Sequence, residues 1–297
     1  MKAPRVTEAP FVSVVVPTYE RPASLRRCLG ALADSTYPAD RFEVVVVDDG
    51  GSASLAPLVD ELRSRLAITL VEQRNAGPAA ARNAGAARAR GDLLAFTDDD
   101  CLPASDWLSL LVDAHRATPD RLLGGRTVNH LPSNPYAATS QLVIDLVYEQ
   151  CNPRPAQATF FTANNMAVAA ALFRETGGFD ASFRAAEDRE LCHRWLSHRR
   201  AMTYVPEAVV RHTNDLTFAA FCRQHFAYGR GAHAYHRRRP PAAIRYSLGF
   251  HGDPRKWLLQ PFRRPLERPA HVCVLLIVWE LANAAGFCAS ALRSPRG

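Results

Sequence analysis

Two short runs of valine constrain the fold of this chain more than any other feature. Val12 to Val16 ends at Pro17, and Val44 to Val47 ends at Asp48-Asp49-Gly50. Continuous apolar runs of this length, closed by turn residues, are typical of strands that are buried on both faces of a parallel sheet. After each run, apolar residues recur at three- and four-residue spacing, which predicts crossover helices. These residues are Leu25, Cys28, Leu29, Leu32, Leu55, Leu58, Val59, Leu62 and Leu66.

The same alternation continues to about residue 100. Ile68 to Glu72 predicts a third strand, Pro78 to Arg90 an Ala-rich helix that begins with proline, and Leu93 to Thr97 a fourth strand. The first hundred residues therefore predict a βαβαβαβ unit. Further along, we expect helices near 107–115, 187–198 and 216–235 and a strand near 122–128, with a loosely structured basic tail from Arg237.

Composition is that of an ordinary globular protein, but the charge is uneven. The 297 residues are 47% hydrophobic and 22% charged, with a formal net charge of +7. Between Arg230 and His271 there are ten Arg or Lys residues and two acids, Asp253 and Glu267. This basic stretch is compatible with binding to an anionic membrane surface or to RNA.

Cysteine usage and apolar segments bear on location. The seven cysteines include no C-x-x-C pair, which is typical of reduced thiols in a cytoplasmic protein, and residues 1–10 do not resemble a secretion signal. Val272 to Ala289 approaches the length of a membrane span but carries Glu280 and Asn283 near its middle. A central charge costs about 2.5–3.5 kcal/mol on insertion scales. We therefore expect a helix that lies on the membrane or packs on the protein.

Three consecutive carboxylates, Asp98 to Asp100, follow the fourth apolar run. Such a triplet can be a solvated turn with a helix cap, because Asp is common in turns. However, Asp48 and Asp49 end the second predicted strand, and Thr18 and Glu20 follow the first. In open α/β sheets ligands bind at this edge, and clustered oxygen ligands favour Mg²⁺ or Mn²⁺ together with substrate phosphates. No G-x-G-x-x-G or P-loop motif is present.

Seven segments together resemble the family 2 glycosyltransferases. They cover about residues 12 to 231, and their order and spacing are more specific than any one of them. The segments are VSVVVPTYERP from 12, VVVVDDGG from 44, RNAGPAAARNAG from 74, LLAFTDDDC from 93, FTANNMAVAAALFRETGGFDASF from 161, AEDRELCHRW from 186 and VPEAVVRHTN from 205.

The resemblance implies a GT-A fold, an α/β fold in which a Rossmann-like, mostly parallel sheet has helices on both faces. It implies an N-terminal extension at 1–10, a nucleotide-sugar-binding half at 11–128, an acceptor and catalytic half at 129–231, and a basic, partly apolar and helical tail at 232–297. It also implies donor-binding positions near the base, ribose and diphosphate. These positions are Pro17, Thr18, Glu20, Asp48, Asp49, Arg74, Arg82, Asp98 and Asp99.

The resemblance also implies the catalytic and metal residues of an inverting, metal-dependent hexosyltransferase. Asp98 and Asp100 match the D-x-D signature for Mn²⁺ or Mg²⁺, and His212 matches a late histidine that completes the metal site. Glu187 and Asp188 match the E-D motif, in which the aspartate is the catalytic base. Acids are also favoured in the first turn of a helix for structural reasons, and a single histidine is more often an ordinary one.

Smaller features complete the sequence-based interpretation. Asn164 and Asn165 are candidates for contact with the donor sugar or the acceptor, and Gly177-Gly178-Phe179-Asp180 predicts a turn that positions the catalytic helix. The Q-x-x-R-W motif of processive synthases is absent, because Arg194-Trp195 is preceded by Leu191, so we expect single transfers.

The expected substrates are a nucleoside-diphosphate sugar, with UDP favoured, and a hydroxyl acceptor. The acceptor could belong to cell-envelope polysaccharide, glycolipid or natural-product glycoside synthesis, and could be lipid-linked. We expect a cytoplasmic protein, peripheral at the inner face of the membrane, that does not act on nucleic acid. Two alternatives stay open: a sugar-nucleotide nucleotidyltransferase, and a non-catalytic basic RNA-binding protein.

Overall fold

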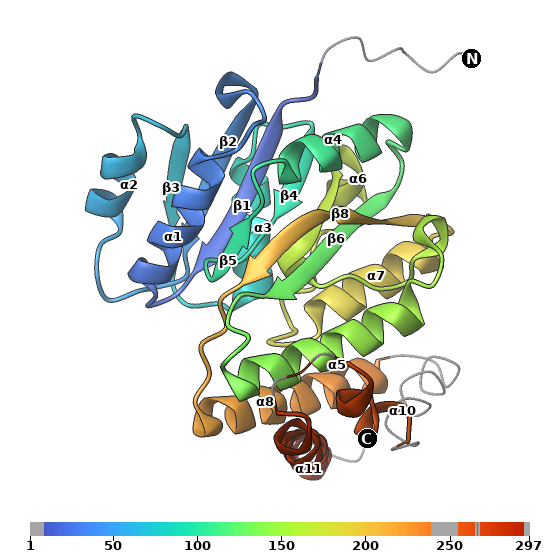
Figure 1. Cartoon of the computed structure of the whole chain (residues 1–297). Helices are drawn as coiled ribbons and strands as arrows, with labels where there is room; N and C mark the ends of the chain where they lie inside the picture. The colour runs from blue at the N-terminus through green and yellow to red at the C-terminus, as the bar shows by residue number, and fades with distance from the viewer. Residues whose placement is uncertain (1–8, 239–254, 265, 267, 294–297) are drawn as a thin grey trace. The chain divides into compact units, whose positions relative to one another are not determined.

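The computed structural model describes residues 9–238, 255–264, 266 and 268–293, which form two compact units (Figure 1). Unit 1 comprises Met1–Val128, Cys151–Ser182 and Glu187–Thr213. Unit 2 comprises Asn129–Gln150, Phe183–Ala186 and Asn214–Gly297. Residues 129–231, expected as one half, are divided between the two units, and the assignment of a nucleotide-sugar half and an acceptor half stays a prediction.

The βαβαβαβ order expected for the first hundred residues is confirmed. β1 pairs in parallel with β2 and with β4, and β2 pairs in parallel with β3. The elements are β1 (Val12–Thr18), α1 (Pro22–Ala33), η1 (Ala39–Arg41), β2 (Phe42–Asp48), α2 (Ala56–Leu62), β3 (Ile68–Glu72), α3 (Pro78–Arg88) and β4 (Leu93–Phe96).

Both faces of this sheet are covered, which explains why its strands are apolar throughout. Successive side chains of a strand point to opposite faces. Val14 and Val16 join a core cluster with Leu25 of α1, whereas Val47 packs in another cluster with Ala81 of α3. Helices therefore lie on both faces, as expected for the GT-A fold (Figure 1).

Beyond β4 the sheet of unit 1 becomes antiparallel. Within the described residues it has eight strands in the order β3-β2-β1-β4-β7-β6-β8-β5. β7 pairs antiparallel with β4 and β6, and β5 pairs antiparallel with β8. The elements are β5 (Cys101–Pro103), α4 (Trp107–Ala117), β6 (Leu122–Asn129), η2 (Pro155–Gln157), η3 (Ala163–Asn165), β7 (Met166–Ala169), α6 (Ala170–Glu175), α7 (Glu187–Ser197) and β8 (Met202–His212).

Unit 2 is helical. Its core contains side chains from α5, α8 and α11, among them Leu146, Phe221, Leu276 and Trp279. The sequence predicts α8 and the apolar helix but not α5. Residues 239–254, 265, 267 and 294–297 of the expected basic tail lie outside the described residues. The elements are α5 (Pro135–Cys151), α8 (Phe218–Arg237), α10 (Arg255–Leu258), η4 (Gln260–Arg263) and α11 (Pro269–Arg293).

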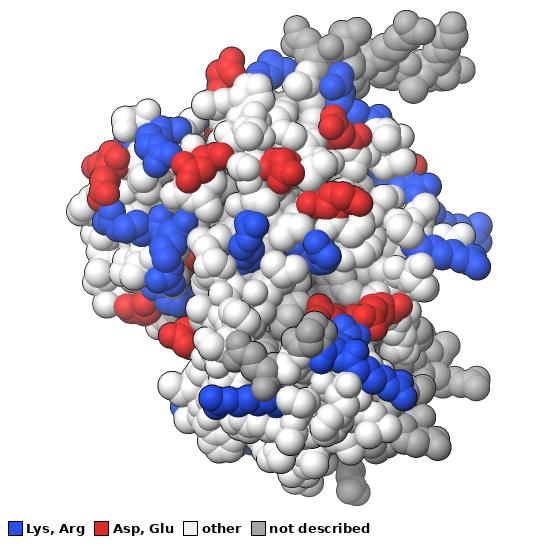
Figure 2. Space-filling model, in the orientation of Figure 1, with Lys and Arg blue, Asp and Glu red and all other residues white. Residues whose placement is uncertain are grey.

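Charged side chains and long apolar helices are found in different parts of the described chain. On the face drawn in Figure 2, basic and acidic side chains are interspersed over unit 1. Within the described part of the chain, α11 is the one helix long and apolar enough to cross a membrane. It has a mean hydropathy of 2.0 over an 18-residue window, of which 28% is buried.

Candidate functional site

The acidic triplet follows β4, and each of its carboxylates has a different partner. Asp98 forms a 2.5 Å ion pair with Arg82. Asp99 accepts a 2.6 Å hydrogen bond from the Thr18 hydroxyl and lies 2.7 Å from Arg21. The other guanidinium nitrogen of Arg21 donates to Asp100 at 2.7 Å. The triplet is therefore not a solvated turn.

The pKa values of Asp99 and Asp100 are shifted in opposite directions because the two carboxylates have different partners. Burial raises the pKa of Asp99 to about 7, and Arg21 opposes that rise. Burial also disfavours the ionised form of Asp100, but the charges of His212 and Arg21 outweigh it and lower the pKa of Asp100 below its usual range. In turn, Asp100 raises the pKa of His212 despite the burial of the imidazole. One acid of the triplet is thus held firmly ionised beside another that titrates near neutrality.

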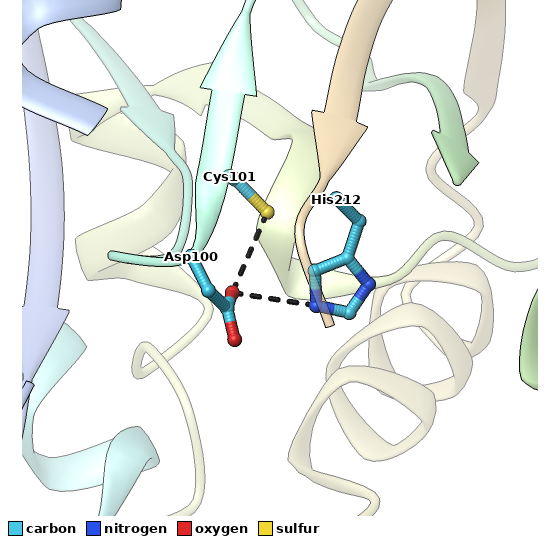
Figure 3. Close-up of side chains that lie close together, drawn as sticks. All are labelled: Asp100, Cys101 and His212. Carbon is cyan, nitrogen blue, oxygen red and sulfur yellow. Dashed lines mark hydrogen bonds and ion pairs between the residues drawn. The ribbon is translucent and has the colours of Figure 1, made fainter. Parts of the chain in front are cut away.

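Asp100 and His212 form the centre of a candidate metal site (Figure 3). The Nε2 atom of His212 lies 3.3 Å from Oδ1 of Asp100. Ligand atoms of Asp100, Cys101 and His212 all lie within 4.8 Å of one another. A carboxylate, an imidazole and a thiol are all donors that divalent metals accept, so the residues present fit an ion. Sequence reasoning missed Cys101, because only the pairing of β5 with β8 brings it opposite His212.

Asp98, the other expected ligand, lies in a different network. The side chain of Arg82 is 4% exposed and donates at 2.8 Å to Glu187, while it pairs with Asp98. Its Nε atom is buried and has no hydrogen-bond partner within the described part of the chain. Arg82 thus bridges Asp98, in the loop that follows β4, and Glu187, the first residue of α7. It has two carboxylates as partners, whereas the sequence suggested a nucleotide.

A glycine turn supports this network from the side. Gly177 and Gly178 have φ values of +86° and +65°, which glycine adopts without steric cost. The next residue, Phe179, exchanges two backbone hydrogen bonds with the side-chain amide of Asn83. Its ring lies 5.6 Å from the guanidinium carbon of Arg82. The turn therefore helps to position Arg82, which holds the start of α7.

Asp188 follows Glu187 at the start of α7 and is half-buried. One carboxylate oxygen accepts a hydrogen bond from the backbone N–H of Arg189 at 2.7 Å. Burial, followed by the neighbouring charge of Glu187, raises the pKa of Asp188 to about 7. A carboxylate with this pKa can accept a proton near neutral pH.

Several expected donor-binding residues hold loops at the ends of β1 and β2. Asp49 accepts from the side chain of Gln73 and from the backbone N–H groups of Ala76 and Gly77, at 2.7–2.8 Å. It therefore fixes the loop that leads into α3. Glu20 has a φ of +56° and accepts from the backbone and hydroxyl of Ser52.

A small surface pocket opens beside these loops. It is lined by Thr18, Glu20, Arg21, Pro22, Asp48, Gly51, Ala53 and Leu55. Pro17 is buried in β1 opposite Val47, and Arg74 is exposed in the β3–α3 loop.

The two asparagines have partners within unit 1. Asn165 is fully buried, donates to the backbone of Arg126 and Ala208, and accepts from the indole of Trp107. Asn164 accepts from Thr127 and Thr162. All of the hydrogen-bonding atoms of the Asn165 side chain are thus engaged, and this residue holds β6, β8 and α4 together.

Sequence comparison finds a matching family model and relatives that are glycosyltransferases. Residues 13–177 match the family model described as glycosyl transferase family 2. A validoxylamine A glucosyltransferase of Streptomyces hygroscopicus subsp. jinggangensis is 32% identical over 232 residues, which cover 68% of this chain and 55% of the relative. The glycosyltransferase AglE of Haloferax volcanii is 27% identical over 300 residues, covering 96% and 97%. The chain thus spans about half the length of the first of these relatives.

Solved structures show the same fold at lower identity. A mannosyltransferase from Pyrobaculum calidifontis in complex with GDP-Man and Mn²⁺ has a TM-score of 0.60 and 23% identity, and covers 98% of this chain and 78% of its own. TarS residues 1–349 from S. aureus in complex with UDP-GlcNAc has a TM-score of 0.56 and 17% identity, covering 93% and 89%. At these identities the likeness concerns the fold.

Proposed function

The chain belongs to glycosyltransferase family 2, and from this premise we propose that it transfers one hexosyl unit from a nucleoside diphosphate to an acceptor hydroxyl. The family acts with nucleotide-sugar donors. We favour UDP as the nucleotide, and the solved relatives that hold UDP-GlcNAc or GDP-Man support a donor of this kind. The acceptor we propose carries a free hydroxyl and belongs to an envelope polysaccharide, a glycolipid or a natural product.

The proposed reaction is a direct displacement at the anomeric carbon. The acceptor oxygen forms a bond to this carbon while Asp188 takes the hydroxyl proton. The bond from the carbon to the diphosphate oxygen breaks, and the diphosphate leaves with the electron pair. A single displacement inverts the configuration. A divalent ion, Mn²⁺ or Mg²⁺, held by Asp100 and His212 would stabilise the charge that develops on the leaving diphosphate.

One observation carries this proposal more than any other. Arg82 pairs with Asp98 of the triplet and with Glu187, the residue next to Asp188. One buried guanidinium within unit 1 thus contacts both the acidic triplet, which contains the candidate metal ligand Asp100, and the residue next to the candidate base. Neither an RNA-binding surface nor an ordinary helix cap needs such a link. A nucleotidyltransferase would not need a base at this position.

The first test removes the base. Replacing Asp188 by Asn preserves the size of the side chain but removes its ability to accept a proton. We expect the rate of transfer to fall about 10²–10⁴-fold, because a positioned base contributes this much. Donor affinity, measured by thermal shift with nucleotide sugars and Mn²⁺, should change little. Full activity in this variant, or release of pyrophosphate in place of a nucleoside diphosphate, would contradict the proposal.

We also propose that unit 2 contacts an anionic membrane surface from the cytoplasmic side. On α11 the exposed apolar side chains Val274, Ile277, Leu281 and Leu292 recur at helical spacing. In the orientation of Figure 2 the surface over α11 is mostly white, which means uncharged. Unit 2 also has exposed arginines that can meet anionic headgroups. They are Arg223, Arg230, Arg237, Arg263, Arg268 and Arg293.

The charge balance of the described part of unit 2 makes anionic lipid the occupant that we favour over a second copy of the chain. Its acids are fewer than its arginines, and Glu149 already pairs with Arg264. A second copy would carry the same basic charge and would be repelled. Basic residues near a membrane surface attract anionic lipids by about 1 kcal/mol each.

A further inference from the structure

The residue that precedes the E-D pair has an unusual backbone conformation. Ala186 has a φ of +70°. Residues with a Cβ atom enter this left-handed region only at an energetic cost, and they stay there only where the surrounding structure holds them. Ala186 is followed directly by Glu187, the first residue of α7, and then by Asp188, the proposed base. The direction in which α7 begins therefore depends on one strained residue.

Within unit 2, α8 holds the segment from Phe183 to Ala186. A Cβ atom on Gly231 would lie 2.7 Å from the carbonyl oxygen of Ala185 and 2.9 Å from its Cβ. Only a glycine lets the backbone of the segment come this close to the helix. The guanidinium carbon of Arg238, the residue that follows α8, lies 4.8 Å from the ring centroid of the buried Phe183. The segment is therefore anchored to α8 at two points.

The helix α8 is also fixed on its other side. Gly229 and Gly231 are two residues apart, so they point about 200° apart around the helix. Gly229 faces the backbone of α11 at Asn283, whereas Gly231 faces Ala185. Because α11 lies in close contact on the opposite side, α8 cannot easily move away from the segment when that side is crowded.

Unit 1 holds the chain on the other side of Ala186. Glu187 accepts a 2.8 Å hydrogen bond from the buried side chain of Arg82. We propose that Ala186 and Gly231 are positioning residues for the base: the packing of α8 on Ala185 keeps Ala186 in its left-handed conformation, and this conformation sets where α7 presents the carboxylate of Asp188. This inference rests on the proposed function, because both residues act through Asp188.

The first test adds one methyl group. Gly231→Ala should displace Ala185 and, with it, the first turn of α7. We expect kcat for sugar transfer to fall roughly tenfold, because a catalytic group misplaced by about 1 Å can cost as much as a hundredfold. The pKa of Asp188 should fall as its carboxylate becomes less buried, so the inflection of the pH profile should move to lower pH. Affinity for UDP with Mn²⁺, measured by calorimetry, should stay unchanged.

A double-mutant cycle separates positioning of the base from a general structural effect. If Gly231 acts through the base, Gly231→Ala should cause no further loss of kcat in the Asp188→Asn variant, which has already lost the base. Equal losses in the two backgrounds would overturn the positioning role and leave Asp188 as the base. Full activity of Asp188→Asn alone would instead overturn the proposed function, and this inference with it.

A second pair of variants tests the same claim without a change in α8. Valine is strongly disfavoured at positive φ, so Ala186→Val should lower kcat and shift the pH profile while UDP affinity is kept. Arg199→Val is the matched control, because Arg199, just beyond the other end of α7, has a φ of +57°. Both variants should melt at lower temperature, but Arg199→Val should keep the kcat and pH profile of the unchanged protein. An Ala186→Val variant that also keeps them would contradict the proposal.

Discussion

Asp98, Asp99 and Asp100 are consecutive in the sequence, yet each forms a different set of hydrogen bonds and ion pairs. Arg82 binds the first, Thr18 and Arg21 bind the second, and Arg21 and His212 bind the third. Like charges this close repel each other, and the cationic partners offset that repulsion. Asp100 and His212 lie 3.3 Å apart, and their role as metal ligands stays a prediction. The role of Asp98 as a direct ligand stays a prediction, and the structure gives that residue a cationic partner.

The raised pKa of Asp188 predicts how transfer depends on pH. The base must be ionised to accept a proton, and its pKa is about 7 because of burial and the charge of Glu187. Below pH 7 the rate should therefore fall about tenfold per pH unit, and above pH 7 it should level off. The measurement is the pH profile of kcat at saturating donor, acceptor and metal.

Glu187→Gln provides the matched comparison for this profile. It removes the neighbouring negative charge that helps to raise the pKa of Asp188, so the inflection should move to lower pH. An inflection that stays near pH 7 in this variant would show that another group sets the profile.

At the scale of elements, α8 and α11 cross at two glycines, where backbone meets backbone. A Cβ atom on Gly286 would lie 2.0 Å from the carbonyl oxygen of Phe226, and one on Gly229 would lie 2.0 Å from that of Asn283. Such contacts leave no room for a methyl group. The glycines therefore set the distance between the two helices.

Replacing Gly286 by Ala should force α8 and α11 apart. Overpacking of this kind typically lowers the free energy of unfolding by about 1–3 kcal/mol. Gly30→Ala in α1 is the control, because a Cβ there has nothing within 4 Å. It should raise stability by about 0.5–1 kcal/mol, since alanine favours the helix. Urea unfolding of both variants checks this, and equal effects of the two would contradict a close crossing.

At the scale of the whole molecule, the exposed apolar face of α11 and the basic side chains of unit 2 predict salt-sensitive membrane binding. Vesicles with anionic lipid should float the protein at low salt, and binding should weaken at high salt as the charges are screened. Vesicles of neutral lipid should bind less protein.

The apolar part of this binding can be tested separately. Exchanging Ile277 and Leu281 for Glu should reduce flotation at least about tenfold, because each buried apolar side chain contributes roughly 1.5–3 kcal/mol. Ala87→Glu, at an exposed position of α3 in unit 1, should leave binding unchanged. Equal flotation of all three proteins would exclude α11 as the contact surface.

The sequence by itself determined the parallel start of the sheet, because strands buried on both faces must be apolar throughout and the Val12 and Val44 runs are. It also determined that acids gather at one sheet edge, since parallel strands end on the same side. Short-range pattern could not reveal α5, β5 or β7.

Only the tertiary structure decided which charged groups meet. The pairing of Arg82 with Glu187 spans 105 residues, and Cys101 meets His212 through antiparallel strands far apart in sequence. Local spacing carries no information about such contacts, because they depend on sheet order and register. Those same contacts fix which carboxylates are ionised and which side chains can hold a metal.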